Sequence, residues 1–265
     1  MWRKMKDKIV IAGYGAVGQA HEYLLERFNF KIQVVDPNYY KKTWRDVGFN
    51  GKVFDYNTQA VIICVSTPQN SDGSCNIDNV VDVLNDVLKP VPVMIKSTLS
   101  IEGLRKNTAM FSHLDITYSP EYLRQENAIQ DFEFSKEISL GGGDIAYWDK
   151  LWKYCCKKVF IRQPEELILG KSFRNAFLAT KVNFFNQVYD MCKACNIDYE
   201  QVRQEVTNDN RIGPSHSFVS KERGFGGHCF PKDTVAILKS ADTNNVDLNI
   251  IRSAVEYNNE VRKSA

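Results

Sequence analysis

Residues 8–18 read KIVIAGYGAVG, a short apolar run followed by three glycines in the pattern G-x-G-x-x-G. The run predicts a buried parallel strand over residues 8–12, and residues 19–28 predict a helix. In this context the first glycine allows a tight turn and the second lets a diphosphate approach the backbone. The third lets the helix pack closely on the strand. We therefore expect a dinucleotide-binding fold whose cofactor contacts Gly13, Gly15, Val17 and Gly18.

A carboxylate follows the second predicted strand. Residues 31–35 form another apolar run, and Asp36 comes directly after it. A carboxylate in this place can accept hydrogen bonds from both hydroxyls of an adenosine ribose, and it repels a 2′-phosphate. Asp36 could instead cap a loop, but its position after the glycine pattern favours the ribose role. The expected cofactor is therefore NAD rather than NADP.

Strand and helix patterns continue to alternate along the first part of the chain. Further strands are predicted at 60–65, 91–95 and 159–161, and further helices at 76–88 and 146–157. We predict an α/β fold with a Rossmann-type doubly wound parallel sheet, forming an NAD-binding domain over residues 1–163. Ligands of such sheets bind beyond the carboxyl ends of the strands, which places Thr67 and Thr98 beside the nicotinamide. Threonines after strands are also common helix caps, so neither residue decides the matter alone.

From residue 165 the pattern becomes helical. Residues 165–195 contain no proline and one glycine, which predicts a single long helix joining domains or subunits. We expect residues 164–265 to form an all-helical central domain that carries this long connecting helix. Lys171 and Asn175 are four residues apart on it and share a face, where they could bind a hydroxyl or an oxyanion. A solvated helix face is the simpler alternative for such a pair.

Residues 224–233 read GFGGHCFPKD and surround Cys229 with glycines on one side and charged residues on the other. Nearby positive charge turns a cysteine into a nucleophile, and Lys232 could supply it. A turn with a buried cysteine is the alternative. Because a nucleotide-binding pattern lies upstream, we interpret Cys229 as a covalent catalyst. Arg211, in a predicted loop at 208–214, suits a carboxylate or phosphate, although most loop arginines are simply exposed.

Composition excludes several classes of function. The net charge of +2 over 265 residues is too small to indicate binding to nucleic acid or to an anionic membrane. No apolar run approaches the roughly 20 residues that span a bilayer. Seven cysteines without a regular framework predict free thiols in a reducing, cytoplasmic compartment. Cys192 and Cys195 form a C-x-x-C without a second pair at metal spacing, so no metal site is predicted.

Several motifs in order along the chain are similar to those of one family. They are GYGAVG at 13–18, STP at 66–68, KST at 96–98, SPEYLR at 119–124, NAFLA at 175–179, DNRIG at 209–213 and the stretch around Cys229. As a set they resemble the UDP-glucose 6-dehydrogenase family, within the wider UDP-glucose/GDP-mannose dehydrogenases. The resemblance implies that two NAD molecules oxidise the C6 alcohol of a nucleotide sugar, UDP-glucose, to a carboxylate.

The same resemblance implies roles for individual residues. Cys229 would capture the intermediate aldehyde as a thiohemiacetal, whose oxidation gives a thioester that water hydrolyses. Lys171 and Asn175 would stabilise the oxyanions, while Asp233 and a water bound by Thr98 or Glu121 would handle protons. Lys232 would lie near the cofactor. The implied substrate contacts are Glu121, Tyr122, Leu123, Lys171, Asn175, Arg211 and Gly226, and the implied assembly is a homodimer through the long helix.

The resemblance has two departures. Gln125 stands where family members usually carry a glutamate implicated in acid–base work. The chain is also expected to be a short form without the family's C-terminal UDP-binding domain. Two alternatives remain open. One is a two-electron 3-hydroxyacid-type dehydrogenase, which has no need for the thiol of Cys229. The other is a non-catalytic or partner-dependent NAD-binding homologue, which the missing domain and Gln125 favour.

Overall fold

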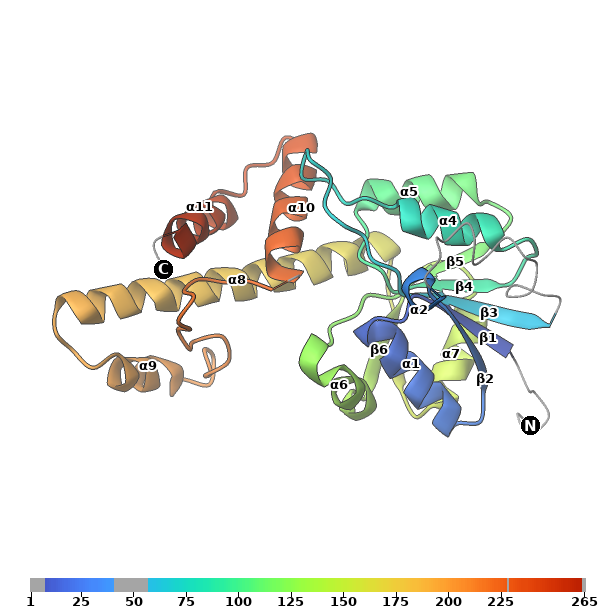
Figure 1. Ribbon diagram of the computed structural model, residues 1–265, viewed down its shortest axis with the longest axis horizontal. Helices are drawn as coiled ribbons and strands as arrows, with labels where there is room; N and C mark the ends of the chain where they lie inside the picture. Colours follow the sequence, from blue (N-terminus) through green and yellow to red (C-terminus); the bar gives the residue numbers. More distant parts are fainter. Residues whose placement is uncertain (1–7, 41–56, 228, 264–265) are drawn as a thin grey trace. The chain divides into compact units, whose positions relative to one another are not determined.

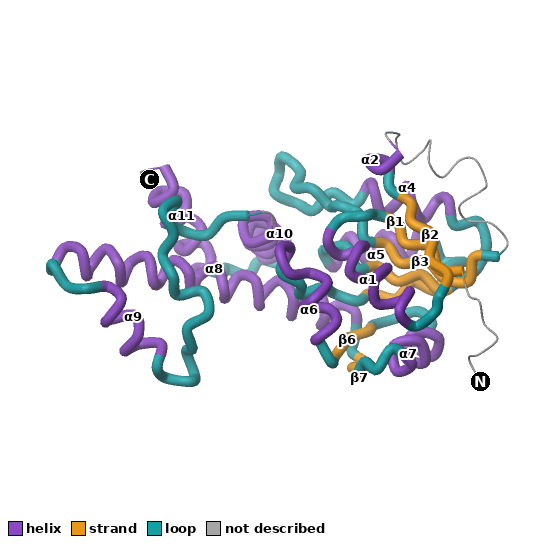
Figure 2. The backbone as a smooth tube through the Cα atoms, turned by 60° about the horizontal axis from the view of Figure 1, so that its bottom comes forward, coloured by secondary structure: helices purple, strands orange, loops and turns teal. Residues whose placement is uncertain are grey.

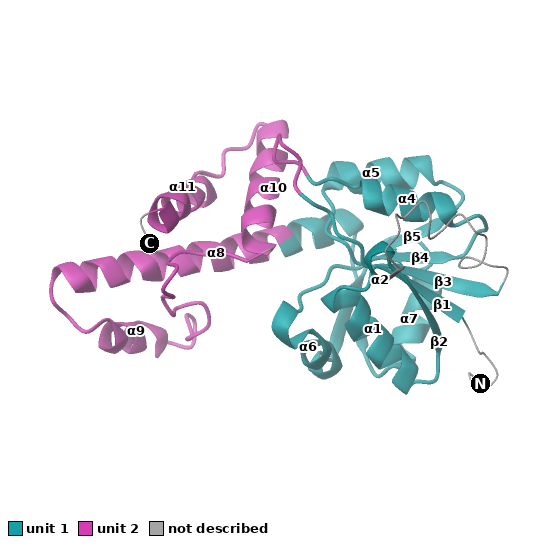
Figure 3. Cartoon of the chain, in the orientation of Figure 1, with its two compact units in different colours: residues 1–68, 75–171 teal, residues 69–74, 172–265 magenta. Residues whose placement is uncertain are grey.

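The computed structural model describes residues 8–40, 57–227 and 229–263. The chain divides into two compact units (Figure 3). Unit 1 comprises Met1–Pro68 and Cys75–Lys171, and unit 2 comprises Gln69–Ser74 and Ser172–Ala265. Every strand among the described residues, drawn in orange in Figure 2, belongs to unit 1.

Unit 1 is built on a parallel sheet whose strand order is β2-β1-β3-β4-β5. The strands are β1 Lys8–Ala12, β2 Lys31–Val35, β3 Thr58–Ile63, β4 Pro92–Ile95 and β5 Asp115–Tyr118. In β1 and β3 nearly every residue is buried, as expected for strands covered on both faces. The sequence order reverses between β1 and β3, so the carboxyl ends of these two strands mark the point where such sheets bind ligands.

Helices cover both faces of this sheet, as the doubly wound prediction requires (Figure 1). One face packs against α4 Asp78–Asp86 and α5 Ile101–Met110, in a core that includes Leu84 and Leu104. The other packs against α1 Ala16–Arg27, α6 Ala128–Phe134 and α7 Ile145–Tyr154, around the fully buried Trp148 and Trp152. Short elements complete the unit: α2 Pro37–Tyr40 and the 3₁₀ turn η1 Gln125–Asn127.

A second, two-stranded parallel sheet lies in unit 1. It pairs β6 Glu137–Leu140 with β7 Lys158–Ile161, and a bridge from Gly141 to Tyr118 joins it to the end of β5. The strand predicted at 159–161 corresponds to β7. All the described strands of unit 1 therefore precede the long helix in the sequence.

The long helix is α8 Pro164–Ala194, as predicted for 165–195. Its first turns belong to unit 1 and its later turns to unit 2, because the division falls after Lys171. The predicted boundary at 163/164 coincides with the start of α8, and it stays a proposal. Unit 2 also contains α9 Tyr199–Thr207, α10 Cys229–Thr243 and α11 Asn249–Lys263. Its described residues are thus helical with connecting loops, as predicted.

None of the helices described in residues 8–40, 57–227 and 229–263 is long and apolar enough to cross a membrane. Within the same ranges, no group of three or more His, Cys, Asp or Glu side chains could hold a metal ion.

Candidate active site

The glycine loop between β1 and α1 is shaped by the backbone around it. Gly13 has φ +97°, and a Cβ there would lie 2.6 Å from the carbonyl carbon and oxygen of Cys64. Its amide donates to the carbonyl of Val35 at 2.8 Å, which ties the loop to β2. A Cβ on Gly18 would lie 2.0 Å from the Gly13 carbonyl oxygen. Only glycine fits at these two positions, since backbone cannot move aside as a side chain can.

Gly15 is different, because it faces open space. A Cβ built there has no heavy atom within 4 Å, and no side chain caps the first turn of α1, which contains Val17. The amide groups of that turn are therefore available to an anion at the positive end of the helix. Beside them, the Asp36 carboxylate accepts hydrogen bonds from the amides of Tyr14 at 2.7 Å and Asn38 at 2.8 Å. The open turn and the adjacent carboxylate fit the diphosphate and the ribose of a dinucleotide.

At the neighbouring strand ends, two sequence-predicted residues come together. Lys171 is buried, and its ammonium donates to the hydroxyl of Thr98 at 2.7 Å. Thr98 follows β4, and the buried Thr67 follows β3. The sulfur of Cys75, which the sequence did not indicate, lies 3.3 Å from the Thr98 carbonyl oxygen. The carboxyl end of the sheet, where we expect the cofactor to bind, therefore carries a hydrogen-bonded ammonium–hydroxyl pair.

Glu121 lies in a buried charged cluster of unit 1. Its carboxylate oxygen Oε2 is 3.0 Å from the ammonium of Lys96 and 3.9 Å from Nε2 of His21. Lys96 also donates to the hydroxyl of Ser119 at 3.0 Å and to the carbonyl of Pro120 at 3.2 Å. Burial alone raises the pKa of Glu121, but the charge of Lys96 and the hydrogen bonds from Lys96 and the Tyr122 amide outweigh it and lower the pKa below its usual value. Glu121 is therefore held ionised.

His21 is fully buried on α1 and stacks on Phe132 with ring centres 4.2 Å apart. Its Nδ1 lies 2.8 Å from the carbonyl oxygen of Val17, so Nδ1 carries the proton and Nε2 presents a lone pair towards Glu121. Burial, reinforced by the charge of Lys96, lowers the pKa of His21 to about 3. The ring is therefore neutral at physiological pH.

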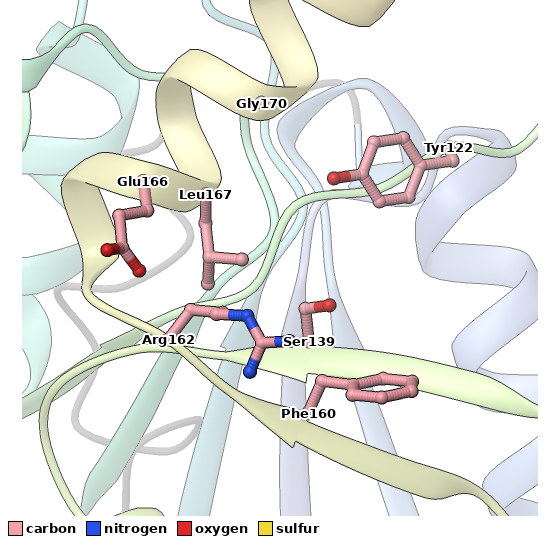
Figure 4. Close-up of a pocket in the computed structure, with 7 residues that line it drawn as sticks. All are labelled: Tyr122, Ser139, Phe160, Arg162, Glu166, Leu167 and Gly170. Carbon is pink, nitrogen blue, oxygen red and sulfur yellow. The ribbon is translucent and has the colours of Figure 1, made fainter.

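A pocket of ≈ 550 Å³ opens beside the predicted substrate segment (Figure 4). The guanidinium of Arg162 lies over the ring of Phe160, 5.6 Å from its centre. Tyr122 contributes its ring to the wall, whereas Leu123 packs into the core beside α1. The lining residues are Tyr122, Ser139, Phe160, Arg162, Glu166, Leu167 and Gly170. Of the two neighbouring residues predicted to contact substrate, Tyr122 is thus available to a ligand and Leu123 is partly buried.

In unit 2, Cys229 is the first residue of α10 and is exposed. Asp233 follows one turn later, and its carboxylate oxygen Oδ2 accepts a hydrogen bond from the Asn175 side chain at 2.7 Å. Asp233 is buried, and its other oxygen Oδ1 lies 3.9 Å from the ammonium of Lys232. Cys229 and Asp233 share a face of α10 because they are four residues apart. Unit 2 therefore brings Asn175 and Lys232 to Asp233, and it places Cys229 one turn before Asp233 on the same helix.

Two predicted substrate residues lie elsewhere in unit 2. Arg211 is exposed in the loop after α9, and its guanidinium pairs with Asp209, which lowers the pKa of that carboxyl. Gly226 packs against Arg262, whose Nη1 would lie 2.9 Å from an added Cβ. Among the described contacts, neither residue touches the pair of Asn175 and Asp233. Their substrate roles stay predictions.

Sequence reasoning missed the residues that hold these groups in place. His21 lies within the helix predicted over residues 19–28, and the sequence assigns it no role; Lys96 enters only as part of the KST motif. Two asparagines of unit 2, Asn186 and Asn258, were not singled out. A lysine that directly follows a buried strand and precedes Ser97-Thr98 is the one local signal that could have found Lys96, because a buried lysine requires a partner.

These features define a dinucleotide-binding fold in unit 1 and an exposed cysteine at the start of a helix in unit 2. Comparison with known protein families matches two parts of the chain to two domains of one family. Residues 52–153 match the NAD-binding domain of the UDP-glucose/GDP-mannose dehydrogenase family, and residues 166–260 match its central domain. The chain belongs to the UDP-glucose/GDP-mannose dehydrogenase family, and its cofactor is NAD.

Individual relatives carry names from the same family. The chain is 30% identical over 230 residues to a UDP-glucose 6-dehydrogenase of Pseudomonas aeruginosa, covering 78% of this chain and 49% of the relative. It is 32% identical over 213 residues to UDP-glucose 6-dehydrogenase YwqF of Bacillus subtilis, covering 75% and 48%. The chain thus spans about half the length of these two relatives. A UDP-glucose 6-dehydrogenase of Campylobacter jejuni is 29% identical, with 97% of this chain and 72% of the relative covered.

Solved structures share the fold. A UDP-glucose dehydrogenase from Pyrobaculum islandicum superposes with a TM-score of 0.83 at 23% identity, covering 97% of this chain and 69% of that structure. A UDP-D-ManNAc dehydrogenase from Pyrococcus horikoshii gives 0.77 at 18% identity, covering 96% and 68%. At these identities the likeness concerns the fold and does not separate the sugars.

Proposed function

We propose that this chain oxidises the C6 alcohol of a nucleotide sugar, UDP-glucose, to the carboxylate in two NAD-dependent steps, with Cys229 as covalent catalyst. The observation that carries the proposal is the arrangement at the start of α10. An exposed cysteine opens the helix, and a buried aspartate held by Asn175 follows one turn later. A two-electron alcohol dehydrogenase needs no such thiol.

The steps balance with the groups available. NAD supplies the oxidant, because it takes up the hydride that leaves C6 in each oxidation. Between the oxidations, the sulfur of Cys229 adds to the aldehyde carbon and the thiol proton is transferred to Asp233 or to water. The carbonyl oxygen takes up one proton, from Asp233 or from water, and becomes the hydroxyl of a thiohemiacetal. Loss of its hydride and its hydroxyl proton gives a thioester, and hydrolysis by one water releases the carboxylate and restores the thiol.

The remaining predicted residues take supporting roles. Lys171 and Asn175 would stabilise the oxygen anions at C6, since an ammonium and an amide both donate hydrogen bonds. A water held by Thr98 or Glu121 would exchange the protons. The lowered pKa of Glu121 keeps its carboxylate ionised, so that it would hold this water by accepting a hydrogen bond. Lys232 would lie near the cofactor. The sugar nucleotide would contact Tyr122, Leu123, Arg211 and Gly226.

NADH release per sugar tests the proposal. Purified chain with NAD and UDP-glucose should give two NADH per UDP-glucuronate, and Cys229→Ala should abolish aldehyde oxidation while NAD binding persists. Cys195→Ala is the matched control, because Cys195 is another exposed cysteine of unit 2. Sustained aldehyde oxidation in Cys229→Ala would favour the two-electron alternative. NAD binding without NADH from any nucleotide sugar would favour an NAD-binding partner of a longer enzyme.

We also propose that two copies associate through α8. Five large apolar side chains are exposed on this helix, at spacings of four and seven residues: Leu169, Phe173, Phe177, Phe184 and Met191. Side chains at such spacings form one stripe along a helix and pack well against the same stripe of a second copy. Phe184→Glu should convert a dimer to a monomer in sedimentation velocity, whereas Lys193→Glu, an exposed change away from the stripe, should not. A monomeric wild-type chain would contradict this proposal.

A further inference from the structure

The segment that leads into Cys229 has an unusual backbone. Arg223, Gly224 and Gly227 have φ values of +57°, +56° and +76°. Left-handed residues in close succession cannot form a helical or strand ladder, so their amides and carbonyls need other partners. Two buried asparagines, from helices far apart in sequence, supply them.

Asn258 of α11 binds both backbone groups of Phe225. Its Oδ1 accepts from the Phe225 amide at 2.7 Å, and its Nδ2 donates to the Phe225 carbonyl at 3.1 Å. Asn258 is 5% exposed and Phe225 3%. The ring of Phe225 lies 6.4 Å from that of Phe230, the residue after Cys229. A paired, buried amide thus fixes the loop close to the reactive residue.

Asn186 of α8 holds the neighbouring position. Its Oδ1 accepts from the Gly224 amide at 3.0 Å and from Nε of Arg223 at 2.8 Å, and the side chain is 1% exposed. A Cβ on Gly224 would lie 2.4 Å from Oδ1 of Asn258. Glycine at this position is therefore what allows the two asparagines to close on adjacent backbone groups.

We propose that Asn258 and Asn186 are positioning residues for Cys229. The two amides clamp the backbone at Gly224 and Phe225 and thereby fix where the thiol stands at the start of α10. The catalytic part of this inference rests on the proposed function, because a covalent catalyst loses about a hundredfold in rate when it is displaced by about an ångström. The hydrogen bonds by which Asn258 and Asn186 hold Phe225 and Gly224 do not depend on the proposed function.

Unit 2 contains a matched control for a purely structural role. Asn183 lies on α8 one turn before Asn186, is 3% exposed, and donates to the carbonyl of Ala254 on α11 at 2.6 Å. It joins the same two helices without touching the glycine segment. Replacing Asn183 should therefore cost stability without moving Cys229.

The experiment compares Asn258→Ala, Asn186→Ala and Asn183→Ala in the full chain. Amide exchange at Phe225 should quicken on the order of tenfold in Asn258→Ala and be unchanged in Asn183→Ala, relative to the global exchange of each variant. If Asn258→Ala does not fold, the rate of amide exchange at Gly224 in Asn186→Ala provides the same test. In both clamp variants kcat for NADH production should fall at least about tenfold with the Kd of NAD unchanged, and Asn183→Ala should keep kcat.

Alkylation makes the result independent of turnover. The rate at which iodoacetamide modifies Cys229, relative to the exposed Cys195, should rise about threefold or more in the clamp variants as the freed loop lets the thiol move. An unchanged ratio, or the same change in Asn183→Ala, would overturn the proposal. If the wild-type chain makes no NADH, the proposed function fails, while the exchange and alkylation rates still decide whether the clamp exists.

Discussion

The glycine loop of residues 13–18 and the glycine segment of residues 223–227 differ in what surrounds them. At Gly13 the nearest atoms to an added Cβ are the backbone of Cys64, and its amide donates to the backbone of Val35. At Gly224 the nearest atom is the side-chain oxygen of Asn258. The first loop is enclosed by neighbouring strand ends, and the second is held by side-chain amides.

The proposed function explains this difference by the group that each loop would position. A diphosphate is recognised by backbone amides, so the first loop needs a rigid backbone with few side chains, which a parallel sheet supplies. A catalytic thiol must be held by the chain on which it sits. In unit 2, which has no strand among its described residues, that support comes from asparagines on two helices. The conformation of the glycine loop in unit 1 therefore depends on backbone packing, and that of the glycine segment in unit 2 depends on side-chain amides.

The largest effect is expected for Gly13→Ala. Alanine must adopt φ near +97° and overlap the Cys64 backbone, which should cost more than about 3 kcal/mol and remove NAD binding. Trp148 and Trp152 are fully buried in unit 1, so the change in tryptophan fluorescence during urea unfolding reports this unit. Gly170→Ala, with open space around a helical position, should be neutral or stabilising. If Gly13→Ala unfolded at the same urea concentration as the wild-type chain, the conclusion that only glycine fits at position 13 would be contradicted.

The second prediction is that acid lowers the stability of unit 1. Unit 1 buries the titratable ring of His21, whereas the asparagine amides that hold the glycine segment of unit 2 do not titrate. The pKa of His21 falls from 6.5 to about 3 on folding. The unfolded chain therefore binds more protons below pH 6.5, and stability declines as the pH falls from 6.5 towards 3. Between pH 7 and pH 5 this residue should cost unit 1 about 2 kcal/mol.

The measurement is the difference in unfolding free energy between pH 7 and pH 5, followed by tryptophan fluorescence. His21→Leu should reduce that difference by about 2 kcal/mol, whatever it does to stability at pH 7. His113→Leu, at an exposed histidine of the same unit, should leave it unchanged. Glu121 adds to the acid sensitivity at lower pH, because its stabilising charge is complete above the ordinary glutamate pKa and is lost as the pH falls through its lowered value. An equal pH dependence in His21→Leu and wild type would show that the ring is not buried neutral.

Gly224→Ala should have a smaller effect than Gly13→Ala, because an asparagine side chain can move aside. Its cost has two parts, the left-handed φ of +56° and the displacement of Asn258. Gly213→Ala isolates the first part, since Gly213 has φ +64° and open space around it. Helical circular dichroism during urea unfolding should show Gly224→Ala about 1 kcal/mol less stable than Gly213→Ala. Equal stabilities would mean that Asn258 does not clamp this loop.

The two loops also show what the sequence could predict. The first is local: a strand, three glycines and a helix lie within twenty or so residues, and each glycine has one geometric reason. Thr98, Lys171, Asn175 and Asp233 were found because their motifs are equally short. Their pairing as Lys171 with Thr98 and Asn175 with Asp233 appears only in the fold.

The clamp could not have been predicted from local pattern. Asn258 lies in a run of polar residues, NNE at 258–260, which is typical of a solvated helix end, yet its side chain is buried. Its partner, Phe225, is separated from it by a complete helix and its connections. His21 was equally hidden, because one polar residue in an amphipathic helix carries no sign of the charged partners that a distant loop brings to it.

The smallest effect on stability is expected at Gly15, where the loop is open to a ligand. Gly15 is the residue before the first turn of α1, and no side chain satisfies the amides of that turn. Serine is a preferred residue in this position, so Gly15→Ser should leave unit 1 as stable as wild type, or up to about 0.5 kcal/mol more stable. The same hydroxyl would occupy the amides that a diphosphate requires, and the affinity for NAD should fall on the order of tenfold. Calorimetric titration with NAD, beside urea unfolding, separates the two readings. Loss of stability together with affinity would show that Gly15 serves the fold, whereas loss of affinity alone would show that the uncapped turn is kept open for the cofactor.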